Sequence, residues 1–280
     1  MESLKNRPKI GLALGGGGSK GFAHIGIIKV LEENNIPIDY IAGTSIGALV
    51  GGLYAATKDI KAIEEMATGT NWKEMLSMAD PSIKQGFFLG EKVKGWIDKN
   101  LAAKKFEETK IPFSAVATDL NTGDAVIFNE GDILEAIRSS ISVPIVLKPV
   151  AHHKQLLSDG GLSLPVPVSV VHDMGADFII AVNLENNYGK RDNVNLFNIA
   201  QNSLWILRLN LAKENIKTAD IVLVPKVLDP GWEAFLTKEK AIEVIKQGED
   251  VAREKLPEIL AALEKQGHQS ILGKIKNLLN

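Results

Sequence analysis

A serine placed between two glycines is the feature that most constrains this chain. The segment Gly43-Thr44-Ser45-Ile46-Gly47 joins an apolar run at residues 38–42 to a second apolar run at residues 46–56. The first run is typical of a buried strand and the second of a buried helix. A strand-to-helix turn with the pattern G-x-S-x-G is so tight that bulky flanking side chains clash, and it exposes the serine hydroxyl. The pattern predicts Ser45 as a nucleophile, with Gly43 and Gly47 forming its elbow.

A plainer interpretation of the same segment is that the glycines allow close packing and that Ser45 only caps the following helix. A simple cap does not call for glycine on both sides of the serine. The elbow is therefore the favoured interpretation, and the cap is the alternative.

A run of four glycines, Gly15 to Gly18, follows the apolar segment at residues 10–14 and precedes a helix predicted over residues 20–34. Backbone N–H groups in such a loop converge on one point beside an electropositive helix end, which makes an anion site. Two anions compete for it. One is a nucleotide phosphate, because residues 16–21 (GGGSKG) satisfy the dinucleotide pattern G-x-G-x-x-G.

The other anion is the oxyanion of a tetrahedral intermediate. A dinucleotide site requires an acidic residue at the far end of the second strand, whereas Asp39 lies at the near end. A phosphate-binding P-loop requires Ser or Thr after its lysine, and Gly21 stands there. Parallel strands would bring the glycine loop and the serine elbow to the same edge of the sheet. These observations favour the oxyanion.

Lys20 stands in the first turn of the predicted helix, where a cation opposes the helix dipole. Either its side chain extends to solvent and has no role, or it orients the glycine loop or attracts an anionic head group.

The order strand, loop, helix, strand, turn, helix in the first 57 residues predicts a right-handed parallel unit of an α/β sheet. Residues 121–124 (NTGD) are a strong hairpin signal. Asp132 and Glu135 form a capping box for a helix that ends before Pro144. Further strands are predicted at residues 115–120, 125–128, 146–150, 155–157, 178–184 and 221–224, and further helices at 60–66, 91–101, 196–218 and after 237, with breaks at Pro257 and Gly267. We expect one domain over residues 1–280, with a helical C-terminal part at 237–280.

A serine nucleophile needs a base, which is normally a histidine. None of the five histidines stands in a setting that demands catalysis: His24, His172 and His268 lie in predicted helices, and His152 and His153 lie in a predicted hairpin turn. Asp159 follows a strand and precedes Gly160 and Gly161, which leave its surroundings open to a close partner. An ordinary Asp-Gly turn is the alternative.

Four blocks in this order resemble the patatin-like phospholipase family, which includes bacterial proteins related to the neuropathy target esterase domain. They are GGGSKG at 16–21, GTSIG at 43–47, SSISVP at 139–144 and DGG at 159–161, and the resemblance covers roughly residues 9–185. The hairpin sequence at 117–128 is also similar. Two departures are Ser139, where the family usually has Ala, and residues 162–165 (LSLP), where a polar pair often precedes the proline.

The resemblance implies an α/β fold of the patatin-like three-layer sandwich type, with a mainly parallel central sheet and helices on both faces. It also implies a Ser-Asp dyad, in which Ser45 attacks and Asp159 takes its proton. The oxyanion donors would be the N–H groups of Gly16, Gly17 and Gly18, joined by that of Ile46. Lys20 would be auxiliary, and no cofactor or metal is expected.

Composition excludes some partners. The formal net charge of −2 and the pI of about 6.2 provide no basic field for nucleic acid. The absence of cysteine excludes thiolate metal sites and a Cys nucleophile. Residues 1–9 are too polar for the apolar part of a signal peptide, which favours a cytoplasmic location. Transient contact with a membrane surface and the oligomeric state are both left open.

The predicted function is hydrolysis of a lipid or other acyl ester, of the phospholipase or lysophospholipase type. An acyltransferase with the same nucleophile and a nucleotide-binding regulatory module are the alternatives. Phe87, Phe88, Leu89 and Trp96 either line an acyl channel or belong to the core. The apolar face of the last helix, at residues 271–279, either docks on the domain or lies on a membrane.

Overall fold

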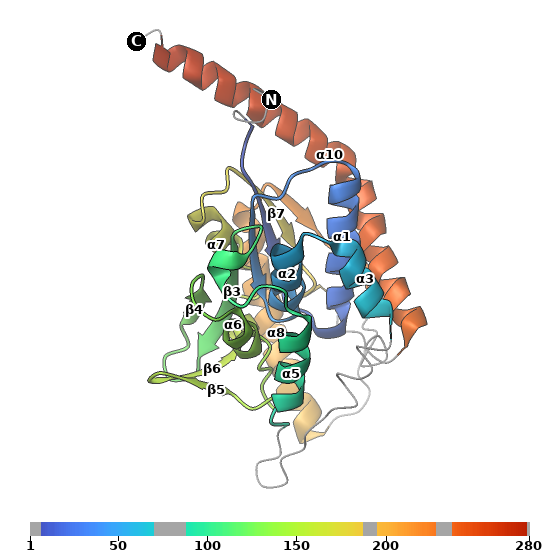
Figure 1. Cartoon of the computed structure of the whole chain (residues 1–280), viewed down its shortest axis with the longest axis vertical. Helices are drawn as coiled ribbons and strands as arrows, with labels where there is room; N and C mark the ends of the chain where they lie inside the picture. The colour runs from blue at the N-terminus through green and yellow to red at the C-terminus, as the bar shows by residue number, and fades with distance from the viewer. Residues whose placement is uncertain (1–6, 70–87, 187–194, 228–236, 279–280) are drawn as a thin grey trace.

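The computed structural model describes residues 7–69, 88–186, 195–227 and 237–278, and their side chains except at 196–197 and 267–278. Its centre is an eight-stranded mixed sheet with the strand order β5-β6-β3-β2-β1-β7-β8, in which β4 also pairs with β3 (Figure 1). Helices cover both faces. The predicted α/β sandwich with a mainly parallel sheet is therefore confirmed.

The parallel part of the sheet contains the most deeply buried strands. It is formed by β1 (Ile10–Leu14), β2 (Tyr40–Thr44), β3 (Phe113–Asp119), β7 (Phe178–Val182) and β8 (Ile221–Leu223). Every residue of β1, β3 and β7 is buried, because both faces of these strands are covered. This is why their sequences show apolar runs without polar alternation.

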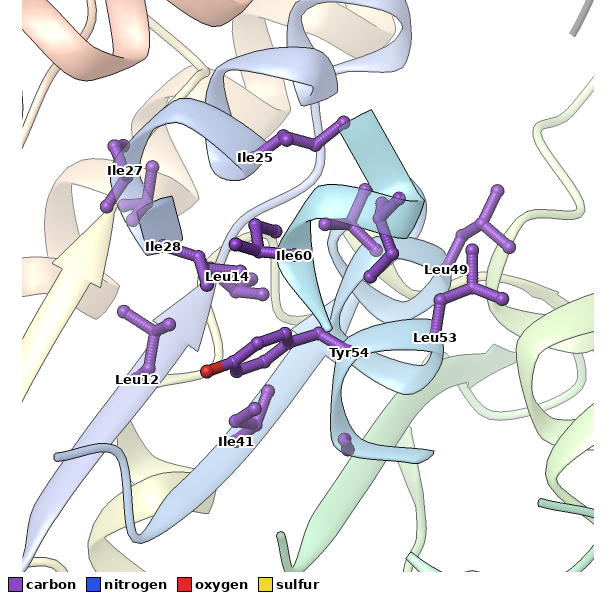
Figure 2. Packing of buried hydrophobic residues seen from close by; sticks show 14 of the residues in the cluster. Leu12, Leu14, Ile25, Ile27, Ile28, Ile41, Leu49, Leu53, Tyr54 and Ile60 are labelled. Carbon is purple, nitrogen blue, oxygen red and sulfur yellow. The ribbon is translucent and has the colours of Figure 1, made fainter. Parts of the chain in front are cut away.

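Side chains of alternate residues in these strands feed two separate cores. Leu12, Leu14 and Ile41 point to one face, where they pack against the apolar helices on that side. Figure 2 shows this packing against the side chains of the first two helices. Ala13 and Ala42 point to the other face. The two cores explain the three layers of the sandwich.

The first face carries α1 (Phe22–Glu33), α2 (Ile46–Thr57), α3 (Ile60–Thr68), α5 (Glu91–Asn100), α6 (Ile133–Ser140) and α10 (Lys238–Leu278). The second face carries α7 (Val168–Asp173) and α8 (Leu196–Asn215). Four short 3-10 helices complete the described elements: η2 (Gly18–Gly21), η3 (Phe106–Glu108), η4 (Gly160–Leu162) and η5 (Ile216–Thr218).

The antiparallel part of the sheet lies beside β3. It contains β4 (Ala125–Phe128), β5 (Val150–His152) and β6 (Gln155–Asp159). The predicted hairpin joins β3 to β4 through residues 121–124. Gly123 has φ 83° in this turn, a backbone conformation that residues other than glycine rarely adopt. Only half of the predicted capping box is present: the Asp132 carboxylate accepts the N–H of Glu135, whereas the Glu135 carboxylate pairs with His152.

The prediction that the C-terminal helix breaks at Pro257 and Gly267 is wrong, because α10 continues through both residues. A proline inside a helix typically costs about 3 kcal/mol. Ala252 and Ile259, which flank Pro257, are fully buried in the first core, and this packing holds the helix together across the proline. In Figure 1, α10 runs along α1.

Other helix and strand boundaries differ from the predicted ones by a few residues. The strand predicted at 38–42 is β2, which starts at Tyr40 and continues directly into the elbow. The strand predicted at 146–150 begins only at Val150, after a series of turns. The structure does not describe the side chains of three predicted features: Phe87, His268 and the apolar face at residues 271–279.

Candidate active site

The serine elbow has the strained geometry that its glycines predict. Ser45 has φ 55° and ψ −124° at the start of α2, in a region that residues with side chains rarely adopt. A Cβ at Gly43 would lie 2.4 Å from the carbonyl oxygen of Gly47, and a Cβ at Gly47 would lie 2.2 Å from that of Leu14. Neither position accepts a larger residue without movement of the backbone. The Ser45 side chain makes no capping hydrogen bond, so the cap interpretation is wrong.

The Ser45 hydroxyl instead contacts Asp159. Its Oγ donates to Oδ2 of Asp159 at 2.5 Å, and Oδ1 of the same carboxylate accepts the N–H of Gly161 at 2.8 Å. Asp159 is fully buried and Ser45 is 4% exposed. A hydroxyl group and a carboxylate are thus held in direct contact at the carboxyl edge of the parallel strands, with water largely excluded.

Strand β3 brings these two residues together from positions far apart in the chain. Thr44, just before the serine, pairs with Val116, and Asp159 pairs with the next residue of β3, Ala117. The carbonyl of Pro112, just before β3, accepts the N–H of Ile41 in β2, and the N–H of Leu120, just after β3, donates to the carbonyl of Leu156 in β6. Pro112 and Leu120 are an even number of residues apart, so these two groups point to the same edge of β3. Strand β6 therefore continues along the same edge of β3 where β2 leaves it to form the elbow.

Hydroxyl and carbonyl groups of nearby residues hold the backbones of Ser45 and Asp159 in place. Ser140, at the end of α6, accepts the N–H of Ser45 at 2.8 Å and donates to the carbonyl of Val116 at 2.5 Å. The carbonyl of Ser142 accepts the N–H of Asp159 at 3.0 Å, and Thr118 donates to the carbonyl of Asp159 at 3.0 Å. The SSISVP block identified in the sequence thus supports the backbones of both Ser45 and Asp159. This role was not predicted, because it depends on where α6 ends in space.

The glycine loop lies against the elbow, since a Cβ at Gly16 would be 3.4 Å from that of Ser45. The N–H of Gly16 already donates to the carbonyl of Pro165 at 2.9 Å. This engaged N–H does not support Gly16 as an oxyanion donor. The N–H groups of Gly17, Gly18 and Ile46 find no acceptor among the residues that the structure describes.

His24 lies under the glycine loop on α1. Its ring is fully buried, and Nε2 donates to the carbonyl of Gly15 at 2.8 Å. Burial lowers its pKa to about 4, and the hydrogen bond to Gly15 opposes this only in part. His24 is therefore neutral near pH 7 and acts as a packed support, as its mid-helix position predicts. No described histidine bonds to Ser45, and His152 instead pairs with Glu135 at 2.9 Å.

Lys20 does not extend to solvent. It is 3% exposed, and its Nζ donates to the carbonyl of Leu184 at 2.6 Å. This hydrogen bond ties η2 to the segment that follows β7. It fits the interpretation that Lys20 orients the glycine loop.

A buried ion pair between Glu185 and Arg208 lies beside the dyad, and sequence reasoning missed it. Burial raises the pKa of Glu185, while the positive charges of Arg208 and Lys20 oppose that rise. Burial alone would lower the pKa of Arg208, but the charges of Glu185 and Asp159 outweigh it and leave that pKa raised. One signal was available: Arg208 is the only charged residue between positions 196 and 212.

Apolar residues predicted to line an acyl channel occupy different environments. Trp96 is 5% exposed and belongs to the first core, whereas Phe88 and Leu89 are 38% and 37% exposed. Arg138 fixes this segment, since Nη2 donates to the carbonyls of Leu89 at 2.8 Å and Lys148 at 3.1 Å. A separate cleft of about 530 Å³ is lined by residues 162–164, directly after the Asp159 turn.

The sequence comparisons agree with this architecture. The chain belongs to the patatin-like phospholipase family, whose pattern it matches over residues 12–172. It is 39% identical over 181 residues to an uncharacterized NTE family protein of Mycobacterium tuberculosis, an alignment that covers 64% of this chain and 50% of that protein. It is 33% identical over 181 residues to the lysophospholipase nte1 of Emericella nidulans, covering 62% of this chain and 12% of that protein. The chain thus spans about half the length of the mycobacterial relative.

Among solved structures, VipD from Legionella pneumophila has a similar fold. The TM-score is 0.53 at 14% sequence identity, and the match covers 90% of this chain and 67% of VipD. In the described part of the chain, no helix combines the length and the apolar character needed to cross a bilayer.

Proposed function

We propose that this chain hydrolyses carboxylic esters of phospholipids or lysophospholipids through a dyad of Ser45 and Asp159. The observation that carries the proposal is the 2.5 Å hydrogen bond from the Ser45 hydroxyl to the Asp159 carboxylate inside a strained elbow. Membership of the patatin-like phospholipase family and similarity to a protein named lysophospholipase support the substrate class.

In the acylation step, Ser45 Oγ attacks the ester carbonyl carbon while its proton moves to Oδ2 of Asp159. The carbonyl oxygen becomes an oxyanion, which the N–H groups of Gly17, Gly18 and Ile46 stabilise. Each such donor typically contributes about 3 kcal/mol to transition-state stabilisation. The carbon–oxygen bond to the leaving alcohol then breaks, and Asp159 gives its proton to that oxygen. Ser45 is left as an acyl ester.

Deacylation repeats these steps with water. Asp159 takes a proton from water as the water oxygen attacks the acyl carbon, and the same donors hold the new oxyanion. Collapse of this intermediate returns the proton to Ser45 Oγ and releases the fatty acid. If an alcohol replaced water here, the same site would transfer the acyl group, so product analysis with added glycerol separates the acyltransferase alternative.

Substitution of the nucleophile tests the proposal most directly. For Ser45→Ala we expect hydrolysis of lysophosphatidylcholine, phosphatidylcholine and p-nitrophenyl butyrate to fall by roughly 10⁴-fold or more. Labelling by a fluorophosphonate probe should disappear while the circular dichroism spectrum stays unchanged. Ser203→Ala, which removes a hydroxyl exposed on α8, is the matched control and should behave as the wild type. Labelling that survives in Ser45→Ala would show that another residue is the nucleophile.

A further inference from the structure

Arg208 reaches the active site from α8, outside the part of the chain that carries the family pattern. Its guanidinium lies between the glycine loop and the turn that follows Asp159. A Cβ at Gly16 would lie 2.9 Å from Nη2, and a Cβ at Gly161 would lie 2.8 Å from Cζ. A side chain at either position would have to displace the guanidinium, so Arg208 lies in close contact with both the glycine loop and the Asp159 turn.

The guanidinium is buried together with its counter-ion. Arg208 is 8% exposed and its Nη2 pairs with Glu185, which is 1% exposed. The charged groups around it come from three other elements: Glu185 after β7, Lys20 on η2 and Asp159 at the end of β6. The charges of Arg208 and Asp159 attract each other, while those of Glu185 and Asp159 repel.

Stability alone is a poor reason for such a pair. Replacing a buried ion pair with apolar residues of similar volume is often neutral or stabilising, because two charges must be removed from water. Arginine also differs from lysine in its planar guanidinium, and here this group lies close to both Gly16 and Gly161. Its place between the glycine loop and the dyad carboxylate points to a role in the reaction.

We infer that Arg208 is a positioning residue for the proposed hydrolysis: it holds the glycine loop against the Asp159 turn, and it places a positive charge near the Asp159 carboxylate. Glu185 holds the guanidinium in place and offsets part of its charge. This inference rests on the proposed function, since it assigns Arg208 to the same reaction.

Charge-changing variants separate this role from simple packing. In Arg208→Met the acidic limb of the kcat/KM profile should move to higher pH by about one unit, because a cation near the base is lost. In Glu185→Gln the limb should move to lower pH, because an anion near the base is lost. At the optimum, Arg208→Met should lower kcat by roughly 10- to 100-fold with KM changed less than about threefold, since the oxyanion donors are misplaced.

Two further variants separate the effect of charge from that of side-chain shape and control for unfolding. Arg208→Lys keeps the charge without the planar fork, so its acidic limb should stay in place while kcat falls. Arg208→Met leaves Glu185 buried without its partner and risks unfolding, so the double variant Arg208→Met/Glu185→Met is made as well. It should fold, keep the lowered kcat, and show an acidic limb between those of the two single variants.

The inference is overturned if Arg208→Met and Glu185→Gln shift the acidic limb in the same direction or leave it unmoved. A folded double variant with wild-type kcat overturns it too. Folded protein is confirmed by circular dichroism at every pH used. Failure of the proposed function is recognised separately, because Ser45→Ala would then keep its activity and probe labelling. If Ser45→Ala is inactive and the Arg208 series behaves as the wild type, only the present inference fails.

Discussion

The serine elbow and the glycine loop lie side by side at the carboxyl ends of β2 and β1, yet they are held in different ways. Close backbone contacts and a neutral hydrogen bond fix the backbone of the elbow: Gly43 and Gly47 admit no side chain, and the Ser140 hydroxyl accepts the N–H of Ser45. The glycine loop is flanked by buried ionisable groups, with Lys20 at its end and Arg208 against Gly16.

The elbow backbone and the glycine loop therefore differ in how far their positions depend on ionised side chains. Steric exclusion and hydroxyl hydrogen bonds do not change with pH, so the strained conformation of Ser45 should persist as long as the protein is folded. The position of the glycine loop depends on charges contributed from distant parts of the chain, at Glu185 and Arg208. The backbone geometry of the elbow and the electrostatics of the glycine loop can therefore be disturbed separately.

The largest effect is expected from the carboxylate that faces the elbow. Asp159→Asn retains an oxygen for the N–H of Gly161 but cannot take the proton of Ser45, so kcat should fall by roughly 10³- to 10⁴-fold. Steady-state kinetics on p-nitrophenyl butyrate measures this. His152→Ala is the control and should keep wild-type activity. Loss of activity in His152→Ala with retention in Asp159→Asn would replace the dyad with a histidine base.

A pH effect is expected on the glycine-loop side, from His24. Its pKa is about 4 in the folded protein and 6.5 when exposed, so the unfolded state binds the proton that the folded state excludes. Stability from this group is therefore complete above pH 6.5 and is lost as the pH falls towards 4, by at most about 3 kcal/mol.

His24→Gln removes this titration and keeps a donor for the carbonyl of Gly15. The free energy of unfolding, measured by urea denaturation at pH 7.0, 5.5 and 4.5, should fall less steeply with acid in the variant than in the wild type. Parallel slopes for the two proteins would rule out His24 as the source of acid sensitivity.

The smallest effect concerns steric exclusion at the elbow. In Gly47→Ala the new Cβ meets the carbonyl of Leu14 at 2.2 Å, so α2 and β1 must separate, and we expect a loss of about 1–3 kcal/mol in the free energy of unfolding. Gly95→Ala is the matched control, since a Cβ there meets nothing within 4 Å inside α5. That change should stabilise the protein by up to about 1 kcal/mol. Equal results from urea denaturation of both variants would contradict the close-packed elbow.

Much of the fold followed from local patterns. The apolar runs predicted the strands and helices of the first 57 residues, because a segment covered on both faces shows no alternation. The hairpin at 121–124 was predicted from turn chemistry. The break at Pro257 was wrong, because packing of residues on both sides of the proline outweighs its local cost. The start of β5 was also missed, since a short edge strand depends on its partner.

Three local turns could be predicted from the sequence alone: a serine between two glycines, an aspartate before two glycines and a run of glycines after a buried strand. Each of these is local, because a tight turn limits its own residues. Three features became apparent only in the folded structure: Ser45 contacts Asp159, the N–H of Gly16 donates to the carbonyl of Pro165, and the Arg208–Glu185 pair lies beside them. These contacts join residues far apart in the chain, and their distances follow from strand register and helix packing.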